Sequence, residues 1–362
     1  MAPLTPAARF LEQEARALLT RLARVKPFAL LSTSVPAAAV SVPAQSAIEN
    51  YLGRGRRELR GRIERFLTWL HRPESQRLTP AELQQRFTFL RLRFNVVLSH
   101  FDIFADVLTQ RSEHETGIFI GGLDVLAADA LELPGVDYVN PAPVICYLVR
   151  DPGAAIRRAR TRLPGGGENP VAVIRVPRER MISSGVASSL VHGVGHQGAA
   201  LLQLVESLRP TLQAVQRKGG AMQPAWRVWE RWVSEIVADF WSVSRVGIAS
   251  SLGLIGVVSL PRAFVFRISA DDPHPSPWIR VLLSCAMGNG LYPHPQWDRL
   301  GALWQSLYPV AESSLASQQL FAMLIATMPD FVRLLLAHRP PSLQQRSLAE
   351  AFRSPDRQPA QL

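Results

Sequence analysis

The spacing of apolar positions along the chain predicts helices in both halves and strands only near the middle. Apolar residues recur every three to four positions over most of the sequence, which is typical of amphipathic helices. Thr79 and Glu82 form a capping box around Pro80, which marks the start of a long helix that runs to about Arg111. The other predicted helices cover residues 5–25, 44–71 and 121–132, with helical patterns from about Ser183 onward.

The pattern changes between residues 136 and 177. Residues 144–149 are all apolar and rich in strand-forming types, residues 171–176 are mostly β-branched, and Pro177 closes the second run, so both runs are predicted strands. Residues 27–48 carry no charge and contain three prolines, which favours a linker. The fold class expected is mainly α (α+β), with an N-terminal helical region at 1–130 and a second domain at 131–362.

Composition excludes several classes of protein. Hydrophobic residues are 47% and charged residues 19% of the 362 residues, which is a globular balance and not that of a disordered chain. The two cysteines, Cys146 and Cys285, exclude a disulfide scaffold and a cysteine-rich zinc ribbon. A metal site in this chain therefore has to use histidines and carboxylates.

The positive charge is weak evidence for a nucleic-acid partner. The chain has 40 Lys+Arg and a net charge of +11, but only two of the 40 are lysines. Arginine, alanine, glycine and proline all have GC-rich codons, so we interpret the bias as a property of the genome, and the arginine runs at 54–65 and 157–162 as solvated faces. The uncharged run at 246–261 is shorter than the roughly 20 residues of a membrane-spanning helix. We expect a soluble, cytoplasmic protein with no membrane span and no nucleic-acid partner.

Two pairs of ionisable residues carry the candidate chemistry. His192 and His196 stand at i and i+4, so a helix places both imidazoles on one face about 6 Å apart, which suits two ligands of a zinc ion. Glu235 and Asp239 have the same spacing on a later predicted helix. Glu235 can complete a His₂Glu ligand set that leaves the fourth position open. Asp239 can accept the free ring N–H of a zinc-bound histidine and fix its tautomer.

These residues resemble the motifs of the gluzincin zinc metallopeptidases, which carry HExxH on one helix and ExxxD on a later one. The segment from His274 to Arg280 is also similar to the HP…R segment of CAAX-prenyl-protease-like enzymes. The resemblance covers roughly 165–285. It implies a zincin-like domain that binds Zn²⁺ and a peptide or protein substrate. It further implies a substrate-binding edge strand at 171–176, and a role for His274 as an oxyanion stabiliser or a wall of the site; the alternative for His274 is a proline-set turn.

The chain departs from this family at the position of the general base. Gly193 follows His192 where the family has its catalytic Glu, and glycine has no side chain that can take or deliver a proton. Three accounts stay open: a natural pseudoenzyme, a point variant of an active enzyme, or substitution by another carboxylate such as Glu168 or Glu179.

The function expected from the sequence is that of a zinc-binding, metallopeptidase-like protein with impaired or absent peptide hydrolysis. The alternative is a non-enzymatic helical scaffold or adaptor that uses its arginine-rich patches to bind an acidic or nucleic-acid partner.

Overall fold

A computed structural model describes most of the chain, and its contacts divide it into two compact units. The described residues are 4–24, 35–112, 114–136, 138, 142–150, 155–163, 166–178, 184–269, 271–354 and 356. The first unit comprises residues 1–124, 142–147 and 157–173, and the second comprises 125–141, 148–156 and 174–362. The contacts therefore divide the chain differently from the expected 1–130 and 131–362, because the strand region contributes residues to both units.

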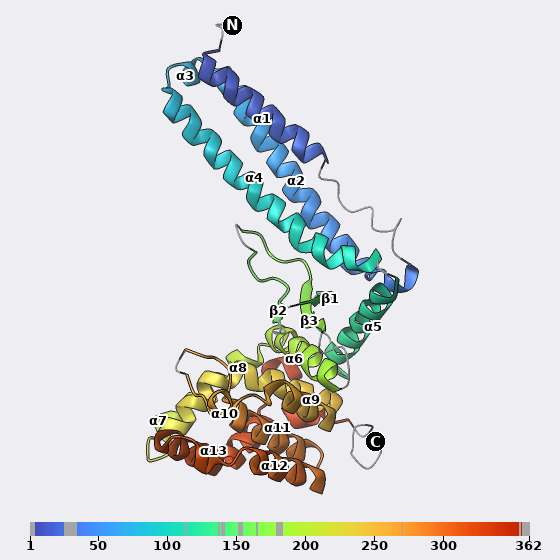
Figure 1. Ribbon diagram of the computed structural model, residues 1–362, viewed down its shortest axis with the longest axis vertical. Helices are drawn as coiled ribbons and strands as arrows, with labels where there is room; N and C mark the ends of the chain where they lie inside the picture. Colours follow the sequence, from blue (N-terminus) through green and yellow to red (C-terminus); the bar gives the residue numbers. More distant parts are fainter. Residues whose placement is uncertain are drawn as a thin grey trace. The chain divides into compact units, whose positions relative to one another are not determined.

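Three long helices build the first unit. These are α1 (Pro6–Arg24), α2 (Val42–Leu70) and α4 (Pro80–Thr109), with the short α3 (Pro73–Gln76) joining α2 to α4. They lie side by side and bury one apolar stripe each, as the amphipathic pattern predicts (Figure 1). The core between them includes Leu59, Ile63, Phe87 and Phe94.

Capping residues explain where these helices begin. Thr79 and Glu82 make the predicted capping box at the start of α4. Ser41 caps α2 by accepting a hydrogen bond from the Ala44 backbone N–H, and Pro43 fits the first turn. The prediction of a linker over 27–48 is therefore wrong for its last residues, where the helix has already started. Residues 27–34 of that linker lie outside the described part of the chain.

A buried arginine joins the end of the long helices to the rest of the first unit. Arg111 lies in the 3₁₀ turn η3 (Gln110–Ser112), and its side chain is 1% exposed. Its guanidinium donates to Asp124 of α5 (His114–Leu131) at 2.7 and 3.1 Å and to the Cys146 carbonyl at 2.8 Å. The predicted helix at 121–132 is confirmed as part of α5, which starts two turns earlier than expected.

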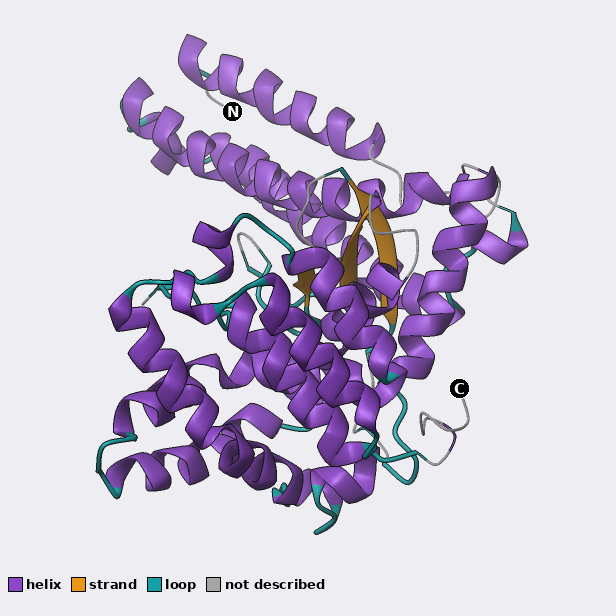
Figure 2. Cartoon of the chain, turned by 60° about the horizontal axis from the view of Figure 1, so that its bottom comes forward, coloured by secondary structure: helices purple, strands orange, loops and turns teal. Residues whose placement is uncertain are grey.

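The predicted strands form a small sheet. Figure 2 shows these strands in orange. They are β1 (Val144–Val149), β2 (Ala155–Arg157) and β3 (Ala172–Pro177), in the order β1-β3-β2. The expectation that the strand at 171–176 is an edge strand is wrong, because β3 has a neighbour on each side. Where β2 covers it, the backbone of β3 has no unpaired side to which an extended peptide can add.

Helices make up the second unit, and α8 lies at its centre. Their bounds are α6 (Ser184–Leu201), α7 (Leu204–Arg217), α8 (Gln223–Val246), α9 (Ile248–Val258), α10 (Arg262–Val265), α11 (Pro277–Leu291), α12 (Pro295–Leu307), α13 (Leu315–Ala337) and α14 (Leu348–Phe352), with 3₁₀ turns η5 (Val310–Glu312) and η6 (Pro341–Leu343). The helices α6, α7, α9, α11, α13 and α14 all contact α8. Trp229, Trp232 and Phe240 of α8 are buried in this core. The prediction of a mainly α fold with a small sheet is confirmed.

Helices α6 and α8 approach each other closely because α6 carries glycines at the contact. A Cβ atom on Gly195 would lie 2.8 Å from the Ala238 carbonyl oxygen and 2.8 Å from the Cβ of Trp241. A Cβ on Gly198 would lie 2.2 Å from the Trp241 ring. The indole is fixed in place because it is fully buried and donates to the Ala130 carbonyl at 2.8 Å. Only glycine fits at these two positions, although each costs about 1 kcal/mol of helix propensity relative to alanine.

One described helix, α13, is long and apolar enough to cross a membrane by length and composition alone. Within the second unit one side of α13 packs on α8 and α11. Trp229 of α8 stacks on Phe331 of α13 at 4.8 Å and donates to Thr327 at 2.9 Å. These contacts give α13 a place in the helical core of the second unit.

Candidate metal centre

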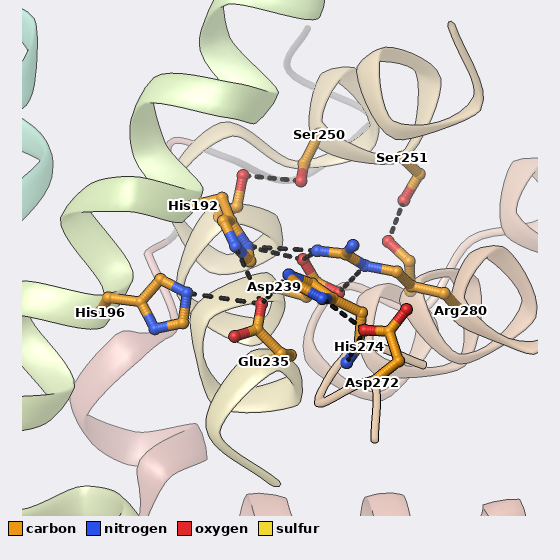
Figure 3. A network of polar contacts seen from close by, with 11 residues as sticks. His192, His196, Glu235, Asp239, Ser250, Ser251, Asp272, His274 and Arg280 are labelled. Atoms are coloured by element: carbon orange, nitrogen blue, oxygen red, sulfur yellow. Dashed lines mark hydrogen bonds and ion pairs between the residues drawn. The ribbon is translucent and has the colours of Figure 1, made fainter. Parts of the chain in front are cut away.

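The two predicted pairs of ionisable residues face each other across the contact between α6 and α8. His192 and His196 lie on one face of α6, and Glu235 and Asp239 lie on the facing side of α8 (Figure 3). The close approach that Gly195 allows sets the distance between these two faces. The side chains of the four residues are between 9% and 19% exposed, so all of them are largely shielded from water.

Three of these residues form a group that could hold a metal ion. The donor atoms of His192, His196 and Glu235 lie within 4.8 Å of one another. Oε2 of Glu235 lies 3.4 Å from Nε2 of His192 and 3.4 Å from Nε2 of His196. These separations are longer than an ordinary N–H···O hydrogen bond. Oε2 is also buried and accepts no hydrogen bond from the described residues. A buried carboxylate oxygen without a partner is costly, and a cation between these atoms would supply the partner.

Asp239 holds the outer side of His192. Its Oδ1 lies 2.8 Å from Nδ1 of His192, so Nε2 is the ring nitrogen that faces Glu235. Arg280 of α11 donates to both oxygens of Asp239, with Nε at 2.6 Å and Nη2 at 2.7 Å. This bidentate pair fixes the carboxylate, which in turn fixes the imidazole.

Burial and neighbouring charges shift the pKa values of Glu235 and Asp239 in opposite directions. Burial alone would raise the pKa of Glu235, but its interactions with His192 and His196 outweigh burial and hold this pKa well below its usual range. Burial is also the largest influence on Asp239, yet the positive charges of Arg280 and His192 keep the pKa of Asp239 well below its usual range. Both carboxylates are therefore ionised at neutral pH, as metal binding requires.

Gly193 lies on α6 beside β3. A Cβ atom there would have as its nearest neighbour the Cγ2 of Ile174, at 3.4 Å. This is ordinary van der Waals contact, in contrast to the overlaps at Gly195 and Gly198. The described packing therefore does not require glycine at position 193, and a methyl group fits there.

His274 lies in the loop before α11, and this loop also reaches Glu235. Its Nε2 is 3.4 Å from Oε2 of Glu235, and its Nδ1 is 2.8 Å from Oδ1 of Asp272. The His274 backbone N–H also donates to Oδ1 of Asp272, at 3.0 Å. The loop is therefore a turn, as one of the two interpretations holds, and it brings a third imidazole to Glu235. The His274 side chain is 51% exposed.

The other sequence candidates lie elsewhere. Glu168 belongs to the first unit, where it forms an isolated bridge with Arg162, and Glu179 lies outside the described residues. Most of the arginines in the run at 54–65 are exposed on α2, and Arg62 pairs with Glu58 at 2.7 Å. Among the described residues, the contacts of these arginines do not indicate a binding site for an acidic partner macromolecule.

The sequence analysis did not predict that Asp272 would contact His274, and it did not assign a partner to Arg280. The i, i+2 spacing of Asp272 and His274 around a proline is a signal for a side chain that accepts a backbone hydrogen bond two residues on.

Comparisons of the chain with protein-family models, with curated proteins and with solved structures find no match.

Proposed function

We propose that this protein binds one zinc ion through His192, His196 and Glu235 and is a metallopeptidase-like protein with impaired or absent peptide hydrolysis. The observation that carries the proposal is the buried Oε2 of Glu235, which lies 3.4 Å from two imidazole nitrogens and accepts no hydrogen bond from the described residues. Two histidines and one glutamate form one of the ligand sets of catalytic zinc sites, in which the fourth position is open. The resemblance to HExxH…ExxxD sequences supports the same assignment.

The residues around this group have separate roles in the proposal. Asp239 holds the proton on Nδ1 of His192, and Arg280 holds Asp239 in place. Zinc bound at such a site polarises a carbonyl group and lowers the pKa of a water molecule. Gly193 cannot accept the proton of that water, and the loss of a positioned general base costs about 10²–10⁴-fold in rate. We therefore expect metal binding without appreciable peptidase activity.

Metal analysis of the purified protein tests the proposal. After loading with zinc and dialysis, elemental mass spectrometry should find one zinc per chain. The double variant His192→Ala, His196→Ala should bind none. The variant His71→Ala is the control, since it removes one imidazole from the C-cap of α2 in the first unit and should keep the zinc.

Three results would contradict the proposal. Wild-type protein that stays free of metal after loading would show that the three donor atoms do not form a site. Equal zinc content in the wild type and the double variant would place the metal elsewhere in the chain. Hydrolysis of a quenched-fluorescent peptide library by the wild type, inhibited by a chelator, would show that a group other than residue 193 acts as the base.

A further inference from the structure

A cavity of about 400 Å³ lies in the first unit, among residues that the proposed metal site does not use. Helix α2 lines one side of it between residues 51 and 58, and α4 lines another between residues 93 and 101. These two helices lie side by side (Figure 1). Residues 166–168, in the loop between β2 and β3, complete the lining, and all of these residues belong to the first unit. The volume falls within the range of small-molecule sites, which is roughly 300–1,000 Å³.

One part of the lining is apolar and fixed in place. Leu52, Val97 and Phe101 are buried and belong to the hydrophobic core of the first unit. Gly55 lines the cavity beside them, and a Cβ atom there would lie 3.6 Å from Cγ1 of Val97, which is ordinary van der Waals contact. The packing therefore does not require glycine at position 55. A long side chain at this position would compete with a ligand for the space of the cavity.

The polar part of the lining carries two arginines. Burial raises the pKa of the Tyr51 hydroxyl, while the nearby positive charges of Arg93 and Arg54 act in the opposite direction. No hydrogen bond or ion pair joins Arg54 to another described residue. Nη2 of Arg93 lies 3.8 Å from Oε1 of Glu58, an oxygen that already accepts a hydrogen bond from Arg62 at 2.7 Å. Both guanidinium groups can therefore take a further anionic partner.

Tyr51 is held firmly at the junction of the two parts. Its hydroxyl oxygen lies 2.9 Å from Nδ1 of His100, which is buried. The loop approaches the same hydroxyl at Gly167, where φ is +94° and a Cβ atom would lie 2.9 Å from the Tyr51 oxygen, so that only glycine fits. Glu168, the next residue, is exposed and adds one negative charge to the lining. Since Arg62 already pairs with Glu58, the cavity keeps an excess of positive charge.

We propose that this cavity binds a small organic anion whose oxyanion group lies between the guanidinium groups of Arg54 and Arg93. The apolar part of the ligand packs on Leu52, Val97 and Phe101. Arginine suits this role because its planar guanidinium donates paired hydrogen bonds to carboxylate and phosphate oxygens. The apolar wall adds affinity, because the part of the ligand that covers it leaves water. The inference does not need a bound metal, so it is independent of the proposed function.

Binding of aromatic anions to the full chain tests the proposal. Saturation-transfer NMR titrations compare 2-naphthoate, 2-naphthyl phosphate and the neutral 2-naphthamide, which share one apolar ring system. We expect a dissociation constant on the order of 1 mM for the better anion, as is usual for a ligand of this size. The amide should bind about tenfold more weakly, because it lacks the charge that the arginines recognise. The anion that binds more tightly identifies the head group, carboxylate or phosphate.

Variants show whether the probe occupies this cavity. Arg54→Gln and Arg93→Gln should each weaken binding of the better anion about tenfold, because each removes charge-assisted hydrogen bonds. Arg60→Gln is the matched control, since Arg60 is an exposed arginine of the same helix that does not line the cavity. Gly55→Leu should weaken binding of all three probes by filling the cavity. Its control, Gly61→Leu, makes the same change on α2 outside the lining and should leave binding unchanged.

The outcomes decide the proposal without reference to zinc, since all titrations contain a chelator. Preference for an anion over the amide, lost in Arg54→Gln and Gly55→Leu but kept in their controls, supports it. Absence of binding by both anions at ten times the expected dissociation constant overturns it. Equal binding of the anions and the amide overturns the role of the arginines. Unchanged binding in a Gly55→Leu protein with wild-type circular dichroism places the probe elsewhere and overturns the site.

Discussion

Alanine substitutions at two glycines of the same helix test how α6 packs on α8. Gly193 and Gly195 both lie in the interior of α6 (Ser184–Leu201), two positions apart. Replacing either by alanine gains about the same helix propensity, roughly 1 kcal/mol. The two variants therefore differ only in what the new methyl group meets, and each is the control for the other.

The structure sets the magnitude of this difference. At position 195 the methyl carbon would lie 2.8 Å from the Ala238 carbonyl oxygen and 2.9 Å from the Ala238 Cα. Backbone atoms cannot rotate away, so α6 and α8 have to separate, and overpacking of this kind costs about 1–3 kcal/mol. At position 193 the nearest atom is the Cγ2 of Ile174 at 3.4 Å, which costs little. We expect Gly193→Ala to be more stable than the wild type by up to about 1 kcal/mol, and Gly195→Ala to be less stable than Gly193→Ala by about 1–3 kcal/mol.

Urea unfolding followed by tryptophan fluorescence measures both values. Seven of the eight tryptophans belong to the second unit, Trp69 being the exception, so the signal reports mainly on the unit that contains α6 and α8. A chelator keeps the protein free of metal, so that the comparison concerns packing alone. Equal free energies of unfolding for the two variants would refute the close contact between α6 and α8, and so would a Gly195→Ala variant that is the more stable of the two.

Three further predictions concern buried charged groups and a histidine. Arg280→Met leaves Asp239 buried without its cation and should destabilise the second unit by about 3–5 kcal/mol in the same assay; a loss below about 1 kcal/mol would contradict the buried pair. Arg111→Met should lower the stability of the first unit by a similar amount, because it leaves Asp124 buried without its cation. The loss is measured as reduced amide-exchange protection in α4 and α5, and unchanged protection would contradict a stabilising Arg111–Asp124 pair. Burial lowers the pKa of His338. The unfolded chain therefore binds a proton there more readily, and stability falls as the pH falls through about 6.5. The fall should be smaller in His338→Gln, and equal slopes would exclude this contribution.

Local signals were enough to predict most helices and strands of this chain. The capping box at Thr79 fixed the start of α4, because two side-chain hydrogen bonds to the backbone are specified within four residues. The predicted start of the second helix, residue 44, lies two residues after the observed start of α2 at Val42, which the cap at Ser41 sets. The central place of β3 in the sheet could not be read from its sequence, because buried strands in any order give the same apolar run.

The candidate metal centre was predictable only where it depends on helical spacing. The i, i+4 pairs place His192 beside His196 and Glu235 near Asp239, whatever the tertiary fold. The meeting of the two pairs depends on Gly195 and Gly198 of α6, which lower its helix propensity and are the condition for its approach to α8. His274 reaches Glu235 from a loop 39 residues further along the chain. Its position could not be predicted, because the path of a loop is not fixed by a local periodicity.

Gly193 and His274 can be tested together in the proposed zinc protein. If residue 193 is the only obstacle to hydrolysis, Gly193→Glu should create peptidase activity, because it supplies the missing base at a position where the atom nearest to a Cβ is 3.4 Å away. Nε2 of His274 lies 3.4 Å from Oε2 of Glu235, so in the role of an oxyanion stabiliser its removal should lower the activity of that variant. The rates of Gly193→Glu and of Gly193→Glu, His274→Ala are compared on a quenched-fluorescent peptide at equal zinc occupancy. Equal rates in the two variants would exclude His274 from the chemistry, and no hydrolysis by Gly193→Glu would show that the missing base is not the only obstacle.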